Sequence, residues 1–534
     1  MNPRHDLSII VTTVGRASLL RAVRSIFSQR FSGPLQVLIG VDTDLSDGKL
    51  ADYRATIEAE CPAHISLLWL DPGYSTSRRH GGVHDCCFGG SLRAILTLLA
   101  DARFAMYLDD DDWLLEDHVT SLLSAIDGKS WAFAYSWFCD GQTGERLCVD
   151  EIESVGIGRG VFTDRFGGFV RPSGMAIDSL ALLKYLYLWS CSPFPAGDGV
   201  DRLIFDRLSR HPVGCTERAT VCYSLDPNDD AAPLRRSFIE GKGKVYPDTP
   251  KPDSLRRTPP RYPAGQPVPR HDLSIIVTTV GRTSLLRTVR SIFSQRFSGP
   301  LQVLIGVDTD LSDGKLADHR ATIEAECPAH ISLLWLDPGY STSRRHGGVH
   351  DCCFGGSMRS ALTLLADARF VTYLDDDDWL LPEHAATILS AIEGKSWAYS
   401  FSWYADGDTS EPLCIDEIES VGVDQGIYAE TYGGFVRPSG LTIDKLALLK
   451  YVHLWSTAGT PSGDGEDRVI FSRLRHEPHA CTGQATVCCA IDPHDPAHPA
   501  RVEFMHRKGI TFRSQTKSES TRGRLTAEIR NPKL

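Results

Sequence analysis

Four consecutive aspartates, Asp109–Asp112, and the same run at Asp375–Asp378 are the residues of this chain best suited to chemistry. Carboxylates this close repel one another, so a fold that keeps them together must neutralise them with a cation or with water. Each run directly follows a short apolar segment. The pattern predicts a divalent cation at the end of a buried strand. The alternative is a solvated acidic turn that caps a helix starting near Leu114.

Two other apolar segments of the first half end in polar residues. Thr12 follows Leu7–Val11, and Asp42 follows Leu35–Val41. Ligands of open α/β sheets bind outside the carboxyl ends of the strands, so these residues are suited to line a nucleotide site with the aspartate run. The second half repeats them as Thr278 and Asp308.

Alternating strands and helices must position these residues. The spacing predicts strands over Leu7–Val11, Leu35–Val41 and Phe104–Leu108, and helices over Ser18–Phe27 and Leu92–Leu99. Strand, helix and strand joined by short connections form a βαβ unit, which requires parallel strands. We therefore predict an α/β fold with a mostly parallel central sheet.

The chain is a tandem repeat with an offset of 266 residues. Residues 5–114 and 271–380 differ at 8 of 110 positions, whereas residues 115–227 and 381–493 differ at 48 of 113. A period this long indicates two whole domains. We place copy one at 1–240, a proline-rich linker at 241–270, copy two at 271–512 and a polar tail at 513–534.

Composition narrows the function classes. The chain has 534 residues, of which 42% are hydrophobic and 23% charged, and its formal net charge is -12. A balance this acidic argues against a protein that holds nucleic acid through its overall field. The sequence contains no transmembrane segment and begins without a signal peptide, which predicts a cytoplasmic protein. Peripheral membrane contact through the mildly basic tail is the alternative.

The order of these segments resembles glycosyltransferase family 2, whose members have the GT-A fold and bind nucleotide sugars. Ser8–Arg16 stands where the family has its opening strand, Leu108–Asp112 matches L-D-x-D-D, and Gly463–Leu474 looks like G-E-D-x-x-L-x-x-R-L. The resemblance covers about residues 6–210 and again 272–476. It implies two tandem GT-A, Rossmann-like domains. The chain departs from the family in reading Gly40–Asp44 where Asp-Asp-Gly-Ser is common.

The resemblance also implies roles for individual residues. Donor contacts would come from Arg93 and Asp109 in copy one and from Arg359 and Asp375 in copy two, in addition to the threonines and aspartates at the other strand ends. Asp111 and Asp377 would bind Mn²⁺ or Mg²⁺. The general bases would be Asp201 and Asp467. The structural alternatives are an arginine on a helix surface for Arg93 and a helix-capping acid at the candidate bases.

The predicted function is a metal-dependent, inverting transfer of a sugar from a nucleotide diphosphate donor to a hydroxyl of a glycan, a lipid-linked acceptor or a protein. A nucleotidyltransferase is one alternative. The other is a noncatalytic sugar- or nucleotide-binding module in one copy, most plausibly copy one, where Val200 stands at the position of Glu466. The near-identical first parts predict one donor for both copies, and the diverged second parts predict acceptors that differ. The alternative is a recent duplication with relaxed drift in the second part.

Two further features have two interpretations each. Gly167–Gly174 is unchanged in copy two although its flanks differ, so Arg171 would either meet phosphate or lie in a tight structural turn. Trp113 and Trp379 would either stack on an acceptor sugar or pack in the core.

Overall fold

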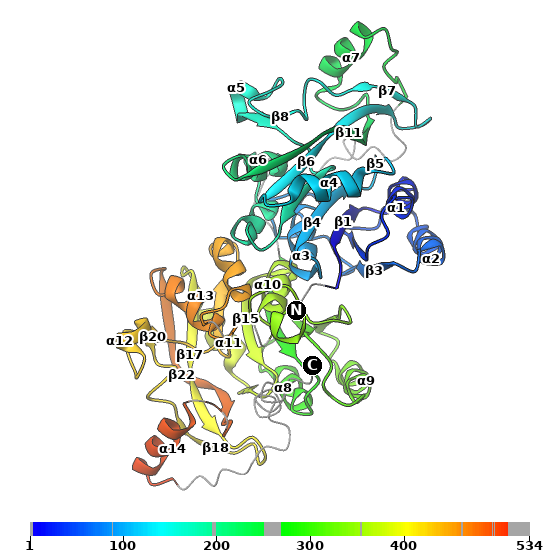
Figure 1. The fold of residues 1–534 in the computed structure, drawn as a ribbon. Coiled ribbons are helices and arrows are strands. Elements are labelled where there is room, and N and C mark those ends of the chain that lie inside the picture. The colour runs from blue at the N-terminus through cyan, green and yellow to red at the C-terminus, as the bar shows by residue number, and fades with distance from the viewer. Residues whose placement is uncertain are drawn as a thin grey trace, which may run out of the picture. The chain divides into compact units, whose positions relative to one another are not determined.

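The computed structural model describes residues 4–249 and 269–510, apart from 88, 195–198, 353–354, 461–462, 494 and 496. Within these residues the chain forms two compact units, built mainly on Met1–Pro269 and on Arg270–Leu534. Each unit carries its own central sheet with helices packed against it (Figure 1).

The first repeat begins with alternating strands and helices and continues with a mixed part. Its strands are β1 (Leu7–Thr13), β2 (Leu35–Val41), β3 (Ile65–Leu70), β4 (Phe104–Asp109), β5 (Trp113–Leu114), β6 (Trp131–Asp140), β7 (Arg146–Val149), β8 (Gly156–Ile157), β9 (Gly168–Phe169), β10 (Met175–Asp178) and β11 (Val213–Leu225). Its α-helices are α1 (Leu19–Phe27), α2 (Leu50–Glu60), α3 (Gly90–Leu99), α4 (His118–Ile126), α5 (Thr163–Phe166), α6 (Val200–Leu208) and α7 (Ala232–Gly241), and its 3-10 helices are η1 (Arg78–His80) and η2 (Leu183–Ser190).

The central sheet has the order β3-β2-β1-β4-β10-β6-β11-β5, with β7 paired to β6. Strands β1 to β4 are parallel, and β11 is parallel to β6. Strand β10 runs antiparallel to both of its neighbours, β4 and β6. The sheet is therefore mostly parallel with one internal antiparallel strand, which confirms the predicted α/β class with two tandem sheets.

Burial on both faces explains the uninterrupted apolar segments of the sequence. Every residue of β1 and of β2 is buried. Central strands of a parallel sheet are covered on both faces, so their sequences do not alternate between apolar and polar residues. Helix α1 contributes Leu19, Val23 and Ile26 to the core cluster that contains the inward residues of these strands.

The second repeat has the same topology, with a sheet of order β14-β13-β12-β15-β21-β17-β22-β16. Its strands are β12 (His271–Thr279), β13 (Leu301–Val307), β14 (Ile331–Leu336), β15 (Ala368–Asp375), β16 (Trp379–Leu380), β17 (Trp397–Ala405), β18 (Pro412–Ile415), β19 (Gly422–Val423), β20 (Gly434–Phe435), β21 (Leu441–Asp444) and β22 (His479–Ala490). Its helices are α8 (Leu285–Phe293), α9 (Leu316–Glu326), η4 (Arg344–His346), α10 (Gly356–Leu365), α11 (His384–Ile392), α12 (Ala429–Tyr432), η5 (Leu449–Ser456), α13 (Glu466–Leu474) and α14 (His498–Arg507).

The predicted linker and tail fall mostly outside the described residues, which exclude 250–268 and 511–534. Tyr246, within the predicted linker, is buried in a cluster with Phe138 and Ile239. Packing of the first unit thus continues past residue 240. No helix in the described parts of the chain combines the length and the hydropathy needed to cross a bilayer.

Candidate active site

The first repeat contains a cavity of about 560 Å³ that every residue predicted to act in copy one helps to line. These residues are Thr12, Asp42, Arg93, Asp109, Asp111 and Asp201. The register of the paired strands explains why three of these six residues lie together. Thr12 lies opposite Asp109 on β4 and Gly40 on β2, and Asp42 directly follows β2. Three adjacent parallel strands therefore end at one wall of the cavity.

Glycine at position 89 lets helix α3 begin close to this wall. Gly89 has φ +69°, and a Cβ atom there would lie 3.0 Å from Cβ of Thr12. A side chain at this position would push against the end of β1, so the absence of one allows the helix to approach the sheet. Helix α3 then carries Arg93 into the cavity.

Arg93 and Asp109 form an ion pair inside the cavity. Arg93 is 7% exposed, and its guanidinium carbon lies 5.3 Å from the ring centroid of Trp189. This excludes the alternative that Arg93 is an arginine on a helix surface. The backbone N–H of Asp109 donates to Oγ of Ser173, 3.0 Å away, which fixes the end of β4. The pair presents a fixed cation and a partly exposed carboxylate to the cavity.

Arg16 joins the two middle aspartates of the run. Its Nη1 lies 2.9 Å from Oδ1 of Asp110 and 3.0 Å from Oδ2 of Asp111, and Thr13 Oγ1 donates to Asp110 at 2.7 Å. Burial, opposed by the charge of Arg16, raises the pKa of Asp110. Asp110 is therefore the buried anchor of the run, whereas Asp111 keeps a side chain that is 19% exposed.

The fourth aspartate has a different task. Oδ1 of Asp112 accepts the backbone N–H of Ser224 on β11 at 2.9 Å. The residues after it form strand β5, which pairs with β11, and helix α4 begins only at His118. The alternative of an acidic turn that caps a helix starting near Leu114 is therefore wrong.

The carboxylate of Asp42 is held by the loop that follows β3. Hydroxyls of Ser75 and Ser77 each donate to it at 2.9 Å, and the backbone N–H of Thr76 does so at 3.3 Å. Asp42 is 1% exposed and lines the cavity. These contacts tie the loop to β2. In copy two, Ser341 Oγ donates to Asp308 at 3.0 Å.

The candidate base of copy one lies in the first turn of helix α6. Asp201 follows Gly199, which has φ +75°, and its Oδ1 accepts the backbone N–H of Arg202 at 2.9 Å. Burial raises the pKa of Asp201, and burial does the same for Asp467. A carboxylate with a raised pKa is a stronger base than an exposed one, which suits proton removal near neutral pH.

Copy two assembles the matching residues in the same way, with one addition. Arg359 pairs with Asp375, and Arg282 Nη1 lies 3.1 Å from Asp376 Oδ1 and 2.7 Å from Asp377 Oδ2. The addition is Glu466, which is 4% exposed and whose Oε1 lies 3.8 Å from Nη1 of Arg359. Burial, and then the neighbouring charge of Asp467, raise the pKa of Glu466 to about 8.

The aspartates fit a divalent cation that a substrate would help to bind. Among the described residues no group of three or more His, Cys, Asp or Glu side chains is placed to hold a metal ion. Mg²⁺ commonly takes only one or two carboxylates from the protein, and phosphate oxygens and water complete its shell. Asp111 lines the cavity with a side chain that is 19% exposed, and Asp377 stands at the matching position of copy two with a side chain that is 24% exposed. Each copy therefore has one accessible carboxylate that fits such an ion.

A buried network of charged side chains also contributes to the lining of the cavity, and sequence reasoning did not predict it. Arg171 pairs with Glu153 and with Asp150, whose Oδ2 lies 2.5 Å from its Nη1. Arg235 donates to Glu153 at 3.0 Å and to Asp229 at 2.8 Å. The structure thus pairs Arg171 with carboxylates, in contrast to the interpretation that it meets phosphate.

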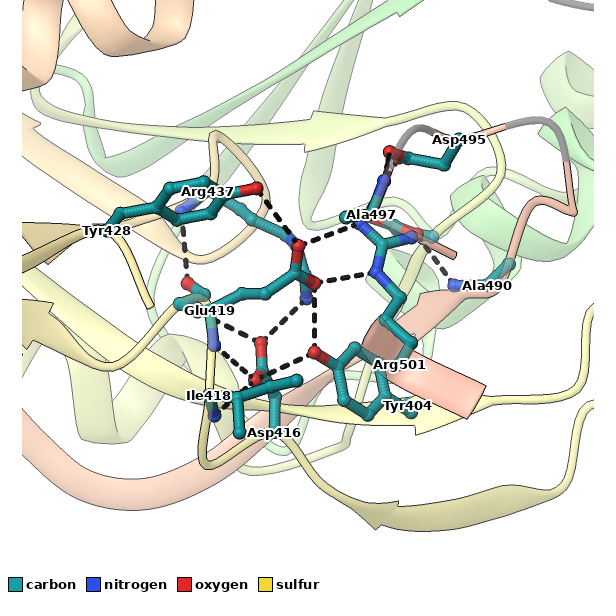
Figure 2. A network of polar contacts seen from close by, with 12 residues as sticks. Tyr404, Asp416, Ile418, Glu419, Tyr428, Arg437, Ala490, Asp495, Ala497 and Arg501 are labelled. Atoms are coloured by element: carbon teal, nitrogen blue, oxygen red, sulfur yellow. Dashed lines mark hydrogen bonds and ion pairs between the residues drawn. The ribbon is translucent and has the colours of Figure 1, made fainter. Parts of the chain in front are cut away.

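Figure 2 shows the same network in copy two, with Glu419 at its centre. The Tyr404 hydroxyl oxygen lies 2.9 Å from a carboxylate oxygen of Glu419 and 2.9 Å from one of Asp416, so the two share its single proton, and Arg501 Nε donates to Glu419 at 2.6 Å. One sequence signal pointed to this network. Residues 150–156 are identical to 416–422 although the surrounding residues have diverged.

Trp113 does not line the cavity. It contributes to a separate open groove, and the guanidinium carbon of Arg21 lies 3.9 Å from its ring centroid. In copy two Arg287 lies 4.1 Å from the ring centroid of Trp379, which is 7% exposed. The interpretation that these tryptophans stack on a bound sugar therefore finds no support in the geometry.

Comparison with known proteins gave structural likenesses only. No protein-family model matches the chain, and no curated protein matches it. The match to the crystal structure of S. aureus TarS covers 44% of this chain and 39% of the TarS chain, at 13% identity and a TM-score of 0.31. The crystal structure of S. aureus TarS 1-349 in complex with UDP-GlcNAc covers 42% and 60%, at 13% identity and a TM-score of 0.31.

Proposed function

We propose that each copy transfers a sugar from a nucleoside diphosphate sugar to an acceptor hydroxyl. The observation that carries the proposal is the convergence, in one cavity, of Asp111 at the end of a parallel sheet, the Arg93–Asp109 pair and Asp201 on a helix from the diverged half of the repeat. This set supplies a cation-binding carboxylate, a fixed positive charge and a base.

The chain's residues would divide the reaction as follows. Asp201 or Asp467 takes the proton of the acceptor hydroxyl while its oxygen bonds to the anomeric carbon. The bond between that carbon and the diphosphate oxygen breaks, and the electron pair leaves with the nucleoside diphosphate. A single displacement of this kind inverts the anomeric centre. Arg93 and Arg359 hold positive charge beside the donor.

A divalent cation, Mn²⁺ or Mg²⁺, held by Asp111 or Asp377 together with phosphate oxygens would offset the charge of the leaving diphosphate. Arg16 and Arg282 hold these aspartates in place through ion pairs. They also keep the buried neighbours Asp110 and Asp376 compensated.

A noncatalytic module in copy one is the second candidate function, and Val200 is the observation that favours it. Copy one keeps Asp201 but lacks a counterpart of Glu466. Under this alternative, copy one would bind a nucleotide sugar without turning it over.

Release of nucleoside diphosphate from a panel of UDP, GDP and dTDP sugars tests the proposal. The full chain with Mn²⁺ is expected to turn over at least one donor. Asp201→Asn combined with Asp467→Asn should lower the rate about 100-fold or more, the usual share of a general base. Asp206→Asn, on the exposed face of the same helix and paired with Arg210, is the matched control. Unchanged turnover in the double variant would contradict the proposal, and full activity of Asp201→Asn alone would favour the noncatalytic module.

A further inference from the structure

The two copies differ in the part of the cavity lining that comes from the diverged half of each repeat, which includes Val200, the residue before the candidate base. Every residue that lines the cavity from Thr12 to Asp111 is identical in copy two. Five other lining positions differ. Phe162, Val200, Tyr223, Asp230 and Leu234 are replaced by Tyr428, Glu466, Cys489, Pro496 and Ala500. The donor end is thus constant, and the changes fall in the diverged half of each repeat.

In copy one, phenyl rings surround the residue after the base. The guanidinium carbon of Arg202 lies 5.7 Å from the ring centroid of Phe162, 5.1 Å from that of Phe166 and 5.7 Å from that of Phe194. A Cβ atom on Gly199 would lie 2.6 Å from the Phe194 ring, so this ring packs directly on the turn that precedes Asp201. Phe162, Val200 and the 43% exposed Leu234 contribute apolar side chains to the lining of the same cavity.

In copy two, polar side chains replace the three phenyl rings and Val200, whereas Ala500 stands at the position of Leu234. Arg468 lies 5.5 Å from the ring centroid of Tyr428 and 5.3 Å from that of Tyr432. Thr460 replaces the third ring, and the nearest atoms to a Cβ on Gly465 would be 3.6 Å away or more. The turn before the base therefore has more room in copy two. Glu466 adds a carboxyl group at the position of Val200.

Each arrangement favours a different neighbour for the reacting hydroxyl. A hydroxyl pressed against Val200 and Phe162 would lose its hydrogen bonds to water without replacement. An apolar group pressed against Glu466 would offer no hydrogen bond to a carboxyl group that is already buried and whose Oε1 lies 3.8 Å from Nη1 of Arg359, beyond hydrogen-bond distance. A hydroxyl beside Glu466 would instead form that bond.

Building on the proposed function, we propose that the two copies take acceptors of different classes. Copy one takes an acceptor whose reactive hydroxyl adjoins an apolar aglycone, and Phe162, Val200 and Leu234 contact that group. Copy two takes a saccharide acceptor and binds one of its hydroxyls through Glu466. The same donor serves both.

Discrimination should be stronger in copy two. An apolar pocket rejects an added hydroxyl only about 100-fold, whereas a site built to bond a hydroxyl rejects an acceptor without one by about 10,000-fold. The test compares octyl glycosides of glucose, galactose and N-acetylglucosamine with the corresponding β-linked disaccharides. Each copy is measured in the full chain, with the other copy silenced by Asp111→Asn and Asp201→Asn or by Asp377→Asn and Asp467→Asn.

The expected result is a kcat/KM ratio of octyl glycoside to disaccharide at least tenfold higher in copy one than in copy two. Phe162→Tyr with Val200→Glu should lower the ratio of copy one at least tenfold. Tyr428→Phe with Glu466→Val should raise that of copy two. Val161→Ile, an exposed difference between the copies that does not line the cavity, is the matched control and should leave the ratio unchanged.

Equal ratios in the two copies, or ratios that the exchanges do not move, would overturn the inference. If Val200→Glu impairs folding of copy one, the copy-two exchange and Glu466→Gln test the same contact from the other side. Release of nucleoside diphosphate distinguishes the two levels of failure. Donor turnover with equal acceptor ratios refutes only the difference in acceptors, whereas no turnover of any donor refutes the proposed function as well.

Discussion

Arg359 Nη1 lies 3.8 Å from Oε1 of Glu466, and copy one has no counterpart of this pair because Val200 stands at the matching position. The contact places a buried carboxyl group beside the arginine that also pairs with the partly exposed Asp375. It is the clearest electrostatic difference between two sites whose donor walls are otherwise identical.

Glu466 should make the stability of the second unit depend on pH. Its pKa is raised to about 8 in the folded chain, against about 4.3 in an unfolded one. Between these values the folded state holds a proton that the unfolded state has lost, so stability falls as pH rises from about 5 to about 8. Glu466 alone can lower the free energy of unfolding by at most about 1.4 kcal/mol per pH unit.

Urea unfolding of the full chain at pH 5.5, 6.5 and 7.5 checks this sign. Glu466→Gln should make the fall shallower, because the amide does not titrate, whereas Asp378, whose pKa burial raises to about 7, keeps part of it. Val200→Ala, at the apolar position of copy one, is the control and should keep the pH slope of the wild type. The same slope in wild type and Glu466→Gln would show that Glu466 is not the titrating group.

Arg16→Met should destabilise the first unit strongly. The substitution leaves Asp110, whose side chain is 6% exposed, without its guanidinium partner. Breaking a buried ion pair from one side costs about 3–5 kcal/mol. Arg24→Met removes the exposed pair with Glu60 and should cost far less, because water and salt screen that pair. Equal losses in denaturant unfolding would mean that Arg16 does not compensate a buried charge.

The local sequence pattern was sufficient to predict the strand ends that form one wall of the site. The segment Leu35–Val41 was predicted as a strand and forms β2 with the same bounds. Thr12, Asp42 and Asp109 were expected at neighbouring strand ends and lie there, because a βαβ pattern makes the strands parallel and brings their carboxyl ends to one edge of the sheet. Their roles in binding stay predictions.

Contacts between residues far apart in the sequence account for what was missed. Trp113 and Leu114 form a strand because they pair with Cys222 and Val221, more than 100 residues away, and a local helix pattern cannot reveal that. Arg171 lies in a glycine-rich segment that suggests a ligand loop. Its carboxylate partners Asp150 and Glu153 become visible only when β8 and β9 bring the two segments together.

Two tyrosines that contact Glu419 should differ in their effect on stability. The Tyr404 hydroxyl is buried and donates to Glu419 at 2.9 Å, whereas the Tyr428 hydroxyl is 3.5 Å away (Figure 2). Tyr404→Phe should cost about 1.5–3 kcal/mol because it removes a hydrogen bond to a charged group. Tyr428→Phe should cost well under about 1 kcal/mol. Thermal unfolding measures both, and a larger loss for Tyr428→Phe would contradict the network.

The number of Mn²⁺ ions bound per chain should equal the number of cation sites. We expect two Mn²⁺ ions per chain in the presence of the nucleoside diphosphate that turnover releases, as measured by electron paramagnetic resonance of free Mn²⁺. Asp111→Asn and Asp377→Asn should each lower the number to one, because each removes one cation-binding carboxylate. Asp44→Asn is the control, since Asp44 caps the backbone of Ser46 and does not line the cavity. Two ions in either single variant would exclude that aspartate as a ligand.

Cation-dependent sugar transfer is tested by donor turnover in the full chain that carries Asp111→Asn and Asp377→Asn together. We expect the wild type to release nucleoside diphosphate from a nucleotide sugar with Mn²⁺ and to lose this activity with EDTA. We also expect the double variant to be at least about 100-fold slower although it remains folded. A double variant that turns over the donor at the wild-type rate would contradict cation-dependent transfer.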